Sequence, residues 1–568
     1  MLTAYTSDQI RAAEATLMAK LPEGTLMGRA ATGLAVTCAA MLDGVYGSRV
    51  VLLVGAGDNG GDALYAGARL AARGARVDAI LAGSRVHGAG LAALRREGGR
   101  VTDIRATSVS ATAAAPVSRD GEAASLKVAR ENGEAARSGN GAGGGEGTHP
   151  GDGAGNGKSA HRGSVPGDGE TARPGGVPRA KDGWGETVRA LVRAADLVVD
   201  GLVGIGGKGA LREPYATLAE LAGETSGAVV AVDVPSGVDA ADGQVDGRAV
   251  RADVTVTFGA YKAGLLVTPG AQHAGRIEFV DIGLGPYLPD PALTALTGTD
   301  VASMLPRPDA RSDKYRRGVV GIAAGSHRYT GAAVLAVGGA IRAGAGMVRY
   351  AGVAEPVAQV RARWPEAVIT ELEPGQGIEE VGRVQAWVLG PGLGTGPEAL
   401  ALARSVLASD VPVLVDADAL TLAAQDGSLL RREAPVLVTP HAGELSRLLE
   451  VPRERIEARG VEHVRRAASE LGVTVLLKGA TTLVAEDGMP VRVNLTGSSW
   501  LATAGTGDVL AGLTGALLAA GLGTYDAASC AAHLHGLAGA DGPLSAWDVL
   551  EAVPDAMRSV ASRPPSRH

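Results

Sequence analysis

The sequence predicts an α/β protein with two domains, each built around a mainly parallel sheet. Short continuous runs of Val and Leu alternate along the chain with helix-like stretches, as expected for parallel strands that are buried on both faces. Glycine-rich or acidic segments follow several of these runs, and ligands bind at the carboxyl ends of the strands in such sheets. Length indicates two large domains or three small ones, because 568 residues exceed the usual domain size of about 100–250 residues.

The N-terminal half contains one long interruption. Its strands are predicted at residues 50–55, 76–81, 197–200 and 228–233. Residues 106–183 are rich in Gly, Ala, Ser and charged residues and lack apolar periodicity, a composition typical of disorder. This segment is either a linker between two domains or an insertion in one, and the similar strand runs on both sides favour the insertion. Because a long loop adds little closure entropy, we expect one domain at 1–295 and no loss of function on deleting Val117–Lys181.

A proline-rich stretch at residues 288–309 separates the second half from the first. Strands are predicted beyond it at residues 319–324, 386–389, 411–415, 436–439 and 473–477, each followed by a helix of ten or more residues. The apolar run 509–523 is shorter than the roughly twenty residues that cross a membrane, so it predicts a buried helix. A second α/β domain is therefore expected at 300–562.

Composition narrows the class of protein further. A net charge of −7 argues against a nucleic-acid binder, which usually carries a basic face. Cys38 and Cys530 are far apart and match neither a metal-ligand spacing nor a disulfide framework. Charged residues interrupt the first twenty positions, where a signal peptide would be apolar. We expect a cytoplasmic homo-oligomer that binds neither membrane nor nucleic acid.

The first motif along the chain is Gly55–Asp62, which reads Gly-Ala-Gly-Asp-Asn-Gly-Gly-Asp and precedes a helix predicted over 63–73. Glycine lets backbone amides approach an anion, and a helix N-terminus favours negative charge. The Asn-Gly-Gly-Asp portion adds polar oxygens beside such a phosphate site. A plain tight turn before the helix is the alternative interpretation.

Two more strand ends in this half carry acidic residues, in the segments Asp200–Lys208 and Asp233–Asp239. A single Asp at a strand end is more often a helix cap or a turn former. Three such ends in one sheet favour a binding site instead. Oxygen atoms of Asn59, Asp200 and Ser236 could coordinate a hard cation there.

Residues 1–290, apart from the insertion, resemble the NAD(P)H-hydrate epimerase family. The segments that carry the resemblance are Gly55–Asp62, Asp200–Lys208, Val232–Gly237 and Thr257–Lys262. The resemblance implies a Rossmann-like domain whose substrate is the R epimer of hydrated NADH or NADPH.

The residues implied by this resemblance have two roles. The substrate contacts are Asp58, Asn59, Gly60, Gly61, Asp62, Gly204, Ile205, Gly206, Gly207, Lys208, Gly209, Ala210 and Asp233. The ligands of a potassium ion are Asn59, Asp200 and Ser236. Asp233 is also the candidate acid/base, and Asp58 departs from the family pattern, which usually has Asn at this position.

The strongest motif of the second half is Ala502–Asp508, which reads Ala-Thr-Ala-Gly-Thr-Gly-Asp and precedes a helix predicted over 509–520. Gly505 and Gly507 leave amides free at the positive end of the helix, where they can hold a transferring phosphoryl group. Asp508 would lie beside a substrate hydroxyl, where a general base acts. A glycine-rich N-cap is the alternative interpretation.

Three other loops at predicted strand ends accompany this motif. They are Gly390–Gly394, Thr439–Glu444 and Lys478–Thr482. Lys478 and the residues after it suit the phosphates or ribose of a nucleotide, and His441 is a candidate ligand contact. Asp416 and Asp418 follow another strand, and for them a functional role and a capping role are equally open.

Together with Gly325–Ala332, these loops resemble the ribokinase-like, nucleotide-dependent NAD(P)H-hydrate dehydratase family over residues 300–560. The resemblance implies removal of water from the S hydrate, with ADP converted to AMP and phosphate and Asp508 taking the proton of the ring hydroxyl. Magnesium is expected from the phosphate chemistry. The implied contacts to the hydrate are Ala332, Gly392, His441 and Asp508, and those to the nucleotide are Lys478, Gly479, Ala480, Thr481, Thr482 and Gly507.

The sequence therefore predicts a bifunctional enzyme that repairs nicotinamide cofactors, with an epimerase and a dehydratase acting on a shared substrate. Two alternatives stay open. A small-molecule kinase can use the same Gly-Thr-Gly-Asp motif, but it would release a stable phosphorylated product. The N-terminal half could also be a non-catalytic nucleotide-binding module, although Asn59, Asp200 and Asp233 argue against this.

Overall fold

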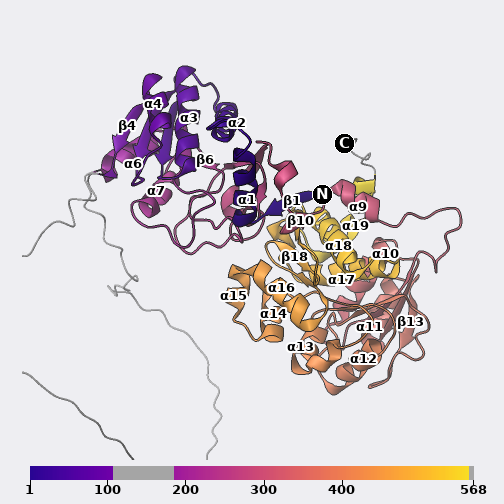
Figure 1. Cartoon of the computed structure of the whole chain (residues 1–568). Helices are drawn as coiled ribbons and strands as arrows, with labels where there is room; N and C mark the ends of the chain where they lie inside the picture. The colour runs from indigo at the N-terminus through magenta and orange to yellow at the C-terminus, as the bar shows by residue number, and fades with distance from the viewer. Residues whose placement is uncertain (106–183, 562–568) are drawn as a thin grey trace, which may run out of the picture. The chain divides into compact units, whose positions relative to one another are not determined.

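The computed structural model describes residues 1–105 and 184–561 and contains two β-sheets (Figure 1). The predicted insertion, at 106–183, lies outside the described residues. Within the described ranges, no helix is both long and apolar enough to span a bilayer. Cys38 and Cys530 are both buried and unpaired.

The first sheet has seven parallel strands. Their order is β4 (Arg100–Asp103), β3 (Arg76–Leu81), β2 (Arg49–Val54), β5 (Leu197–Gly201), β6 (Ala228–Val232), β7 (Val254–Phe258) and β9 (Arg276–Val280). Strands β2 and β5 are direct neighbours, with Val50 paired to Leu197. The segments before and after the undescribed residues thus belong to one sheet, as the sequence predicts.

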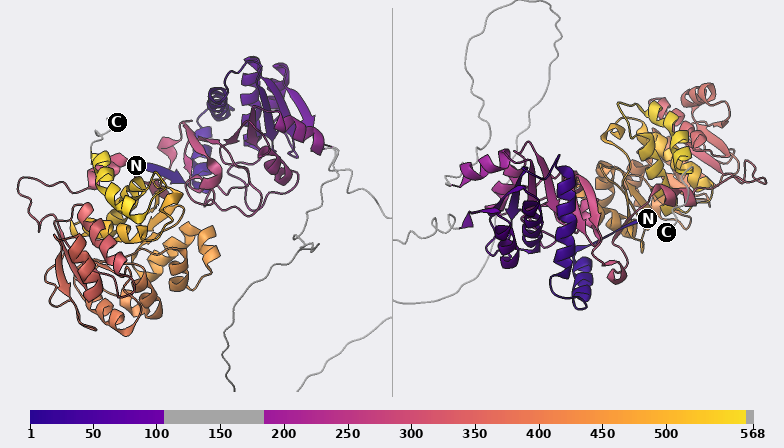
Figure 2. Two further views of the ribbon diagram at one scale, coloured as in Figure 1. Left: turned by 180° about the vertical axis from the view of Figure 1, so that it is seen from behind. Right: turned by 90° about the horizontal axis from the view of Figure 1, so that it is seen from above.

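Helices cover both faces of this sheet (Figure 2). They are α1 (Ser7–Met18), α2 (Thr25–Met41), α3 (Asp58–Ala72), α4 (Gly88–Arg96), α6 (Gly185–Arg193), α7 (Tyr215–Ala222) and the short α8 (Ala271–Ala274). Because side chains alternate along a strand, Val50 and Leu52 pack into one cluster with Leu64 of α3. Val51 faces the other way and lines a cavity with Ala190 of α6.

The second sheet has twelve strands. Their order is β13 (Val368–Glu371), β12 (Met347–Gly352), β11 (Val319–Ala323), β14 (Ala386–Leu389), β15 (Val413–Val415), β16 (Val436–Val438), β17 (Thr474–Leu477), β18 (Thr482–Ala485), β19 (Val491–Asn494), β10 (Leu293–Ala295), β1 (Leu2–Tyr5) and β8 (Tyr261–Lys262). Strands β13 to β17 in this order are parallel, so their carboxyl ends meet at one edge. Strands β18 and β19 continue the sheet in antiparallel fashion.

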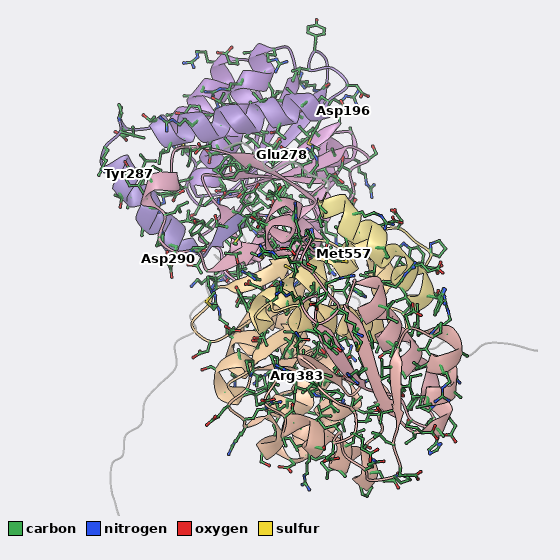
Figure 3. The ribbon with its side chains drawn as sticks, turned by 90° about the vertical axis from the view of Figure 1, so that its right-hand side faces the viewer. Asp196, Glu278, Tyr287, Asp290, Arg383 and Met557 are labelled. Atoms are coloured by element: carbon green, nitrogen blue, oxygen red, sulfur yellow. The ribbon has the colours of Figure 1, made fainter. Side chains whose placement is uncertain are left out.

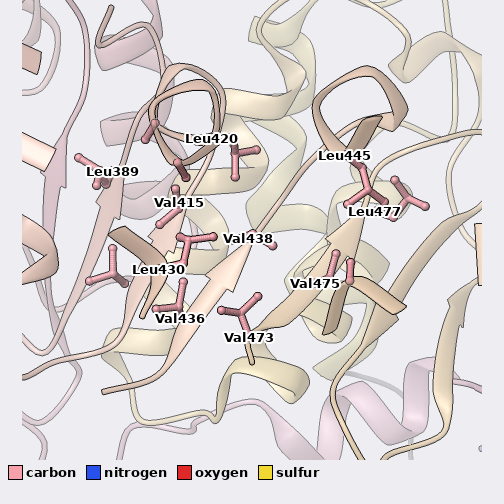
Figure 4. Close-up of a cluster of buried hydrophobic side chains, with 14 of the residues drawn as sticks. Leu389, Val415, Leu420, Leu430, Val436, Val438, Leu445, Val473, Val475 and Leu477 are labelled. Carbon is pink, nitrogen blue, oxygen red and sulfur yellow. The ribbon is translucent and has the colours of Figure 1, made fainter. Parts of the chain in front are cut away.

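The second group of helices also forms two layers. It comprises α9 (Gly298–Met304), α10 (Thr330–Arg342), α11 (Ala354–Arg363), α12 (Pro397–Leu407), α13 (Asp418–Gln425), α14 (Ala442–Leu449), α15 (Arg453–Ala458), α16 (Gly460–Leu471), α17 (Thr506–Ala519), α18 (Thr524–Ala538) and α19 (Ala546–Ala561). Val320 and Ile322 of β11 join a core cluster with α10, α17, α18 and α19. The opposite face packs against α12, α13, α14 and α16, and Figure 4 shows part of this second cluster around Val415, Val438 and Val475.

Two predictions about elements are wrong in detail. Helices α3 and α17 begin at Asp58 and Thr506, several residues before the predicted starts, because the glycines that precede them already act as N-caps. The motif residues thus form first helical turns and not loops. Strand β17 is followed by the hairpin partner β18 instead of a helix, and α13 and α14 have only eight residues each.

Candidate active sites

Asp233 lies directly after β6 with its backbone in the left-handed region, at φ 69°. This conformation is uncommon for a residue other than glycine and is often found at functional sites. The Asp233 carboxylate is 6% exposed, and its Oδ1 accepts hydrogen bonds from Phe258 N (3.2 Å) and from the Lys262 ammonium. Lys262 is 1% exposed and also donates to Phe258 O at 2.8 Å. Asp233 and Lys262 form a buried ion pair.

Further carboxylates surround this ion pair. Asp62, in α3, is buried, and its Oδ1 has no hydrogen-bond partner among the described residues. Burial raises the pKa of Asp62 well above its usual range, and the charges of Asp233, Asp58 and Glu14 raise it further. Burial and the charge of Asp233 also raise the pKa of Glu14. The charges of these carboxyls would repel an anionic group of a substrate placed among them. The carboxyls can instead exchange protons with a substrate.

No motif in the sequence marks Glu14, because this residue lies on α1, far along the chain from the glycine-rich and acidic segments. Helix α1 is attached to the segment after β9, where Gln9 Nε2 donates to Asp290 O at 2.9 Å. Tyr287 and Asp290, both labelled in Figure 3, lie in the segment after β9. The Lys20 ammonium lies 4.5 Å from the centre of the Tyr287 ring. These contacts fix the helix that carries Glu14.

The three predicted cation ligands lie near one another at the ends of β5 and β6. Asp200 Oδ1 accepts from Ser236 Oγ at 2.6 Å, and Asp200 Oδ2 accepts from Ser236 N at 2.8 Å. The Asn59 amide donates to Val232 O, and its Oδ1 lies beside Gly204.

The chemistry of this donor set fits a potassium ion. Asp200 is 0% exposed, and burial raises its pKa to about 6 although Ser236 and Leu202 donate hydrogen bonds to it. No basic side chain pairs with Asp200 in the described part of the chain. A carboxylate accepts about four hydrogen bonds or ligands, so a hard cation could still bind and offset the buried charge.

The loop 204–210 is only partly directed toward these residues. Gly204 lies against Asn59, and Arg11 of α1 donates to Ile205 O at 3.0 Å. Lys208, Gly209 and Ala210 are exposed. The first three helical positions of α3, Asp58, Asn59 and Gly60, present their backbone amides at the helix N-terminus, with Gly61 in the same turn.

In the second sheet, the ends of β15 and β17 meet at the first turn of α17. Lys478 Nζ donates to Asp416 Oδ1 at 2.7 Å and lies 3.9 Å from Glu444 Oε2. A Cβ atom on Gly507 would lie 3.6 Å from the same ammonium. The Lys478 ammonium and the N-terminus of α17, both of which attract anions, thus lie side by side.

Asp508, in the first turn of α17, is the best candidate for a general base. Burial raises its pKa to about 7, the neighbouring charge of Asp416 raises it, Lys478 lowers it and Asp418 raises it. A carboxyl with this pKa can both accept and release a proton near neutral pH. Asp418 accepts a hydrogen bond from Gly394 N at 2.8 Å and so fixes the Gly390–Gly394 loop, although it caps no helix. Asp416 instead holds Lys478.

His441 is the N-cap of α14. Its Nδ1 accepts from Gly443 N (2.9 Å) and Glu444 N (3.2 Å), and Glu444 completes a capping box. Burial lowers the pKa of His441, and a neutral ring with Nδ1 as acceptor carries its proton on Nε2. The Nε2 donor lies 3.5 Å from Glu444 Oε1, and it is the ring nitrogen that the capping bonds do not use.

The other predicted contacts of this half divide into two groups. Ala332 of α10 lies against Gly392, whose φ of 60° and lack of Cβ permit the close approach. Gly479 and Ala480 form the exposed turn between β17 and β18, and Thr482 begins β18. Thr481 Oγ1 accepts from Thr268 N at 3.1 Å.

His535 of α18 is a second residue that the sequence did not reveal. Its Nε2 lies 2.9 Å from Thr506 O, and because a carbonyl only accepts, the ring nitrogen donates. Burial lowers the pKa of His535 to about 4. This neutral histidine anchors the first turn of α17, next to Gly507 and Asp508.

Each half thus holds a group of carboxyls whose pKa values are raised by burial and neighbouring charge, an arrangement typical of enzymes. A family model described as NAD(P)H-hydrate dehydratase matches residues 320–556. A second, described as YjeF-related protein N-terminus, matches residues 23–114 and 175–264.

Curated relatives match both halves together. The "Bifunctional NAD(P)H-hydrate repair enzyme Nnr" of Mycobacterium tuberculosis (strain CDC 1551 / Oshkosh) is 42% identical over 536 residues, covering 92% of this chain and 91% of the relative. The enzyme with the same name from Mycobacterium leprae (strain TN) is 41% identical over 552 residues, covering 96% and 94%. The chain therefore belongs to the family of bifunctional NAD(P)H-hydrate repair enzymes.

Among solved structures, the ADP/ATP-dependent NAD(P)H-hydrate dehydratase from Bacillus subtilis, co-crystallised with ATP and Mg²⁺, is 29% identical. The alignment covers 47% of this chain and 98% of the other, with a TM-score of 0.43.

Proposed function

We propose that the first half interconverts the R and S forms of hydrated NADH and NADPH, and that the second half dehydrates the S form while ADP is converted to AMP and phosphate. The first domain is assigned to residues 1–295 and the second to 300–562. The observation that carries the proposal is the pair of distinct centres: a buried carboxylate–lysine site, and a lysine, a helix N-terminus and a carboxyl of pKa about 7 at one sheet edge.

In the epimerase half, the reaction inverts the carbon that bears the hydroxyl added by hydration. Loss and return of that hydroxyl require one group that accepts a proton and one that donates it. Asp233 is the proposed acid/base, and its ion pair with Lys262 fixes its orientation. The amides of Asp58–Asp62 and the loop 204–210 are proposed to bind the substrate.

In the dehydratase half, the ring hydroxyl attacks the terminal phosphorus of ADP, and its proton passes to Asp508. The bond from that phosphorus to the bridging oxygen breaks and AMP departs. The ring C–O bond of the phosphorylated hydrate then breaks with phosphate as the leaving group, and loss of a ring proton regenerates the dihydronicotinamide. Lys478–Thr482 and Gly507 are proposed to bind the nucleotide, and Ala332, Gly392, His441 and Asp508 to face the hydrate.

Two ions are part of the proposal. Potassium, held by Asn59, Asp200 and Ser236, would supply a positive charge beside the buried carboxylate of Asp200. The described residues contain no cluster of three or more His, Cys, Asp or Glu able to hold a metal. Magnesium commonly binds through substrate phosphates, water and one or two carboxylates, so it would enter with the nucleotide. We also propose a cytoplasmic homo-oligomer.

The test supplies purified protein with mixed R and S hydrated NADH, Mg²⁺ and either ADP or ATP. Recovery of the dihydronicotinamide absorbance and release of free phosphate are followed together. Nearly complete recovery, faster than spontaneous epimerisation, is expected with ADP. Recovery that stops at the S fraction would remove the epimerase assignment, and a stable phosphorylated product would indicate a kinase.

A further inference from the structure

Asp416 is a buried carboxylate that the proposed reaction does not use. It follows β15 and is 1% exposed. Its position is fixed by the backbone, because Asp416 N donates to Leu389 O at 2.9 Å and a Cβ atom on the neighbouring Gly390 would lie 1.9 Å from Asp416 O. A buried carboxylate without a partner would be strongly destabilising, and the partner here is Lys478 Nζ, at 2.7 Å.

The ion pair between Asp416 and Lys478 offsets the repulsion between the Lys478 ammonium and the positive end of α17. The N-terminus of α17 carries partial positive charge, and a second positive group beside it is repelled. Lysine has a flexible four-carbon stem, so the ammonium of Lys478 would otherwise turn away. Asp416 instead holds it 3.6 Å from where a Cβ of Gly507 would stand. Two groups that attract anions are therefore kept together before any phosphate binds.

The same carboxylate acts on the general base. Burial raises the pKa of Asp508 to about 7, and the charge of Asp416 contributes in the same direction while Lys478 opposes it. The other charged or titratable groups facing this region are Asp418 on α13, Glu444 and His441 at the start of α14, and His535 on α18. Glu444 lies 3.9 Å from Lys478 Nζ, farther than Asp416.

We propose that Asp416 is a positioning residue of the dehydratase: it holds the ammonium of Lys478 at the first turn of α17, where this ammonium stabilises the negative charge of the phosphoryl group as the group passes from ADP to the hydrate. The inference rests on the proposed dehydratase function. It predicts that Asp416 affects the rate of phosphoryl transfer more than the binding of ADP, because the ammonium would otherwise be present but misplaced.

The test compares wild type with Asp416→Asn in the full chain, measuring kcat and KM for ADP in dehydration of the S hydrate between pH 5.5 and 8.5. The kcat of Asp416→Asn should fall at least about tenfold, with KM for ADP changed less. Removing a negative charge lowers the pKa of Asp508, so the rise of kcat with pH should move to lower pH. A loss of kcat whose pH dependence stays unmoved, or a loss confined to KM, would overturn the proposal.

Two further variants complete the test. Asp416→Glu keeps the negative charge, but its extra methylene moves the carboxylate and with it the paired ammonium of Lys478. This variant should therefore retain the wild-type pH dependence and lose part of kcat. Full wild-type kcat in Asp416→Glu would overturn the positioning role even if Asp416→Asn does not fold. Asp555→Asn removes an exposed carboxylate of α19, paired with Arg558, and should behave as wild type. A wild-type enzyme that fails to dehydrate the S hydrate would refute the proposed function itself.

Discussion

At the scale of single residues, burial sets the protonation chemistry of both sites. Asp233 and Asp62 are buried and Asp508 is partly buried, and each has different neighbours. Asp233 is paired with a lysine, Asp62 has an oxygen without a described partner, and Asp508 faces another carboxylate and a lysine. The same residue type can therefore serve as base, as acid or as both.

Replacing Asp233 by Asn should abolish epimerisation and spare dehydration. The variant cannot exchange a proton and leaves the Lys262 ammonium buried without its partner, so we expect the epimerase rate to fall by about 10²–10⁴-fold. Conversion of the R hydrate to the S hydrate is the measurement, with dehydration of pure S hydrate as internal reference. Asp196→Asn is the matched control, because Asp196 precedes β5 whereas Asp233 follows the parallel strand β6, so the two carboxyls lie at opposite strand ends. Epimerisation that survives in Asp233→Asn would remove Asp233 from the mechanism.

Dehydration should depend on pH through Asp508. A general base works when it is ionised, and burial raises the pKa of Asp508 to about 7, so kcat should decline as pH falls through about 7 and level off above it. The measurement is kcat for the S hydrate at saturating ADP across pH 5.5–8.5. A kcat that is constant over this range, or an active Asp508→Asn variant, would contradict the role of Asp508.

At the scale of elements, the contact of α10 with α17 sets where the first turn of α17 lies. The two helices approach closely because glycines line the contact: a Cβ atom on Gly512 would lie 1.9 Å from Ala336 O, and one on Gly339 would lie 2.4 Å from Val509 O. This packing fixes α17, whose first turn carries Gly507 and Asp508.

Gly512→Ala should therefore destabilise the protein although alanine favours helix. We expect a loss of about 1–3 kcal/mol of unfolding free energy, because the added methyl group forces the helices apart. The measurement is chemical denaturation of the second half, with dehydratase activity recorded in parallel. Gly523→Ala serves as control, since a Cβ there meets nothing within 4 Å. Equal unfolding free energies of Gly512→Ala and Gly523→Ala would contradict the prediction, because they would show that α10 and α17 accommodate the added methyl group without cost.

At the scale of the whole molecule, the first sheet is assembled from strands on both sides of residues 106–183. Strand β2 pairs with β3 and with β5 in parallel register, and these contacts involve only described residues. The strands before and after residues 106–183 therefore pair directly with one another.

Deletion of residues 117–181 should accordingly leave both activities intact. A shorter loop changes closure entropy only logarithmically, and the flanking elements β4 and α6 end at Asp103 and begin at Gly185. Epimerase and dehydratase rates and the melting temperature of the shortened protein are the measurements. Loss of epimerase activity alone would assign a functional role to the segment.

The strands were predicted well because their signal is local. Runs such as 76–81 and 386–389 coincide with β3 and β14, since a strand buried on both faces is recognisable from its own composition. Short strands such as β1 and β10, with three or four residues, lack such a signal. The helix starts at Asp58 and Thr506 were misplaced because a glycine N-cap gives no side-chain signature.

The sequence by itself determined the α/β class, the positions of the principal strands along the chain and the glycine-rich motifs that follow them, since each of these depends on neighbouring residues. Only the tertiary structure decided that Asp416 pairs with Lys478, that Glu14 joins Asp62 and Asp233, and that His535 anchors Thr506. These contacts join residues distant in the chain. They depend on strand order and helix packing, which bring together side chains that no local pattern relates.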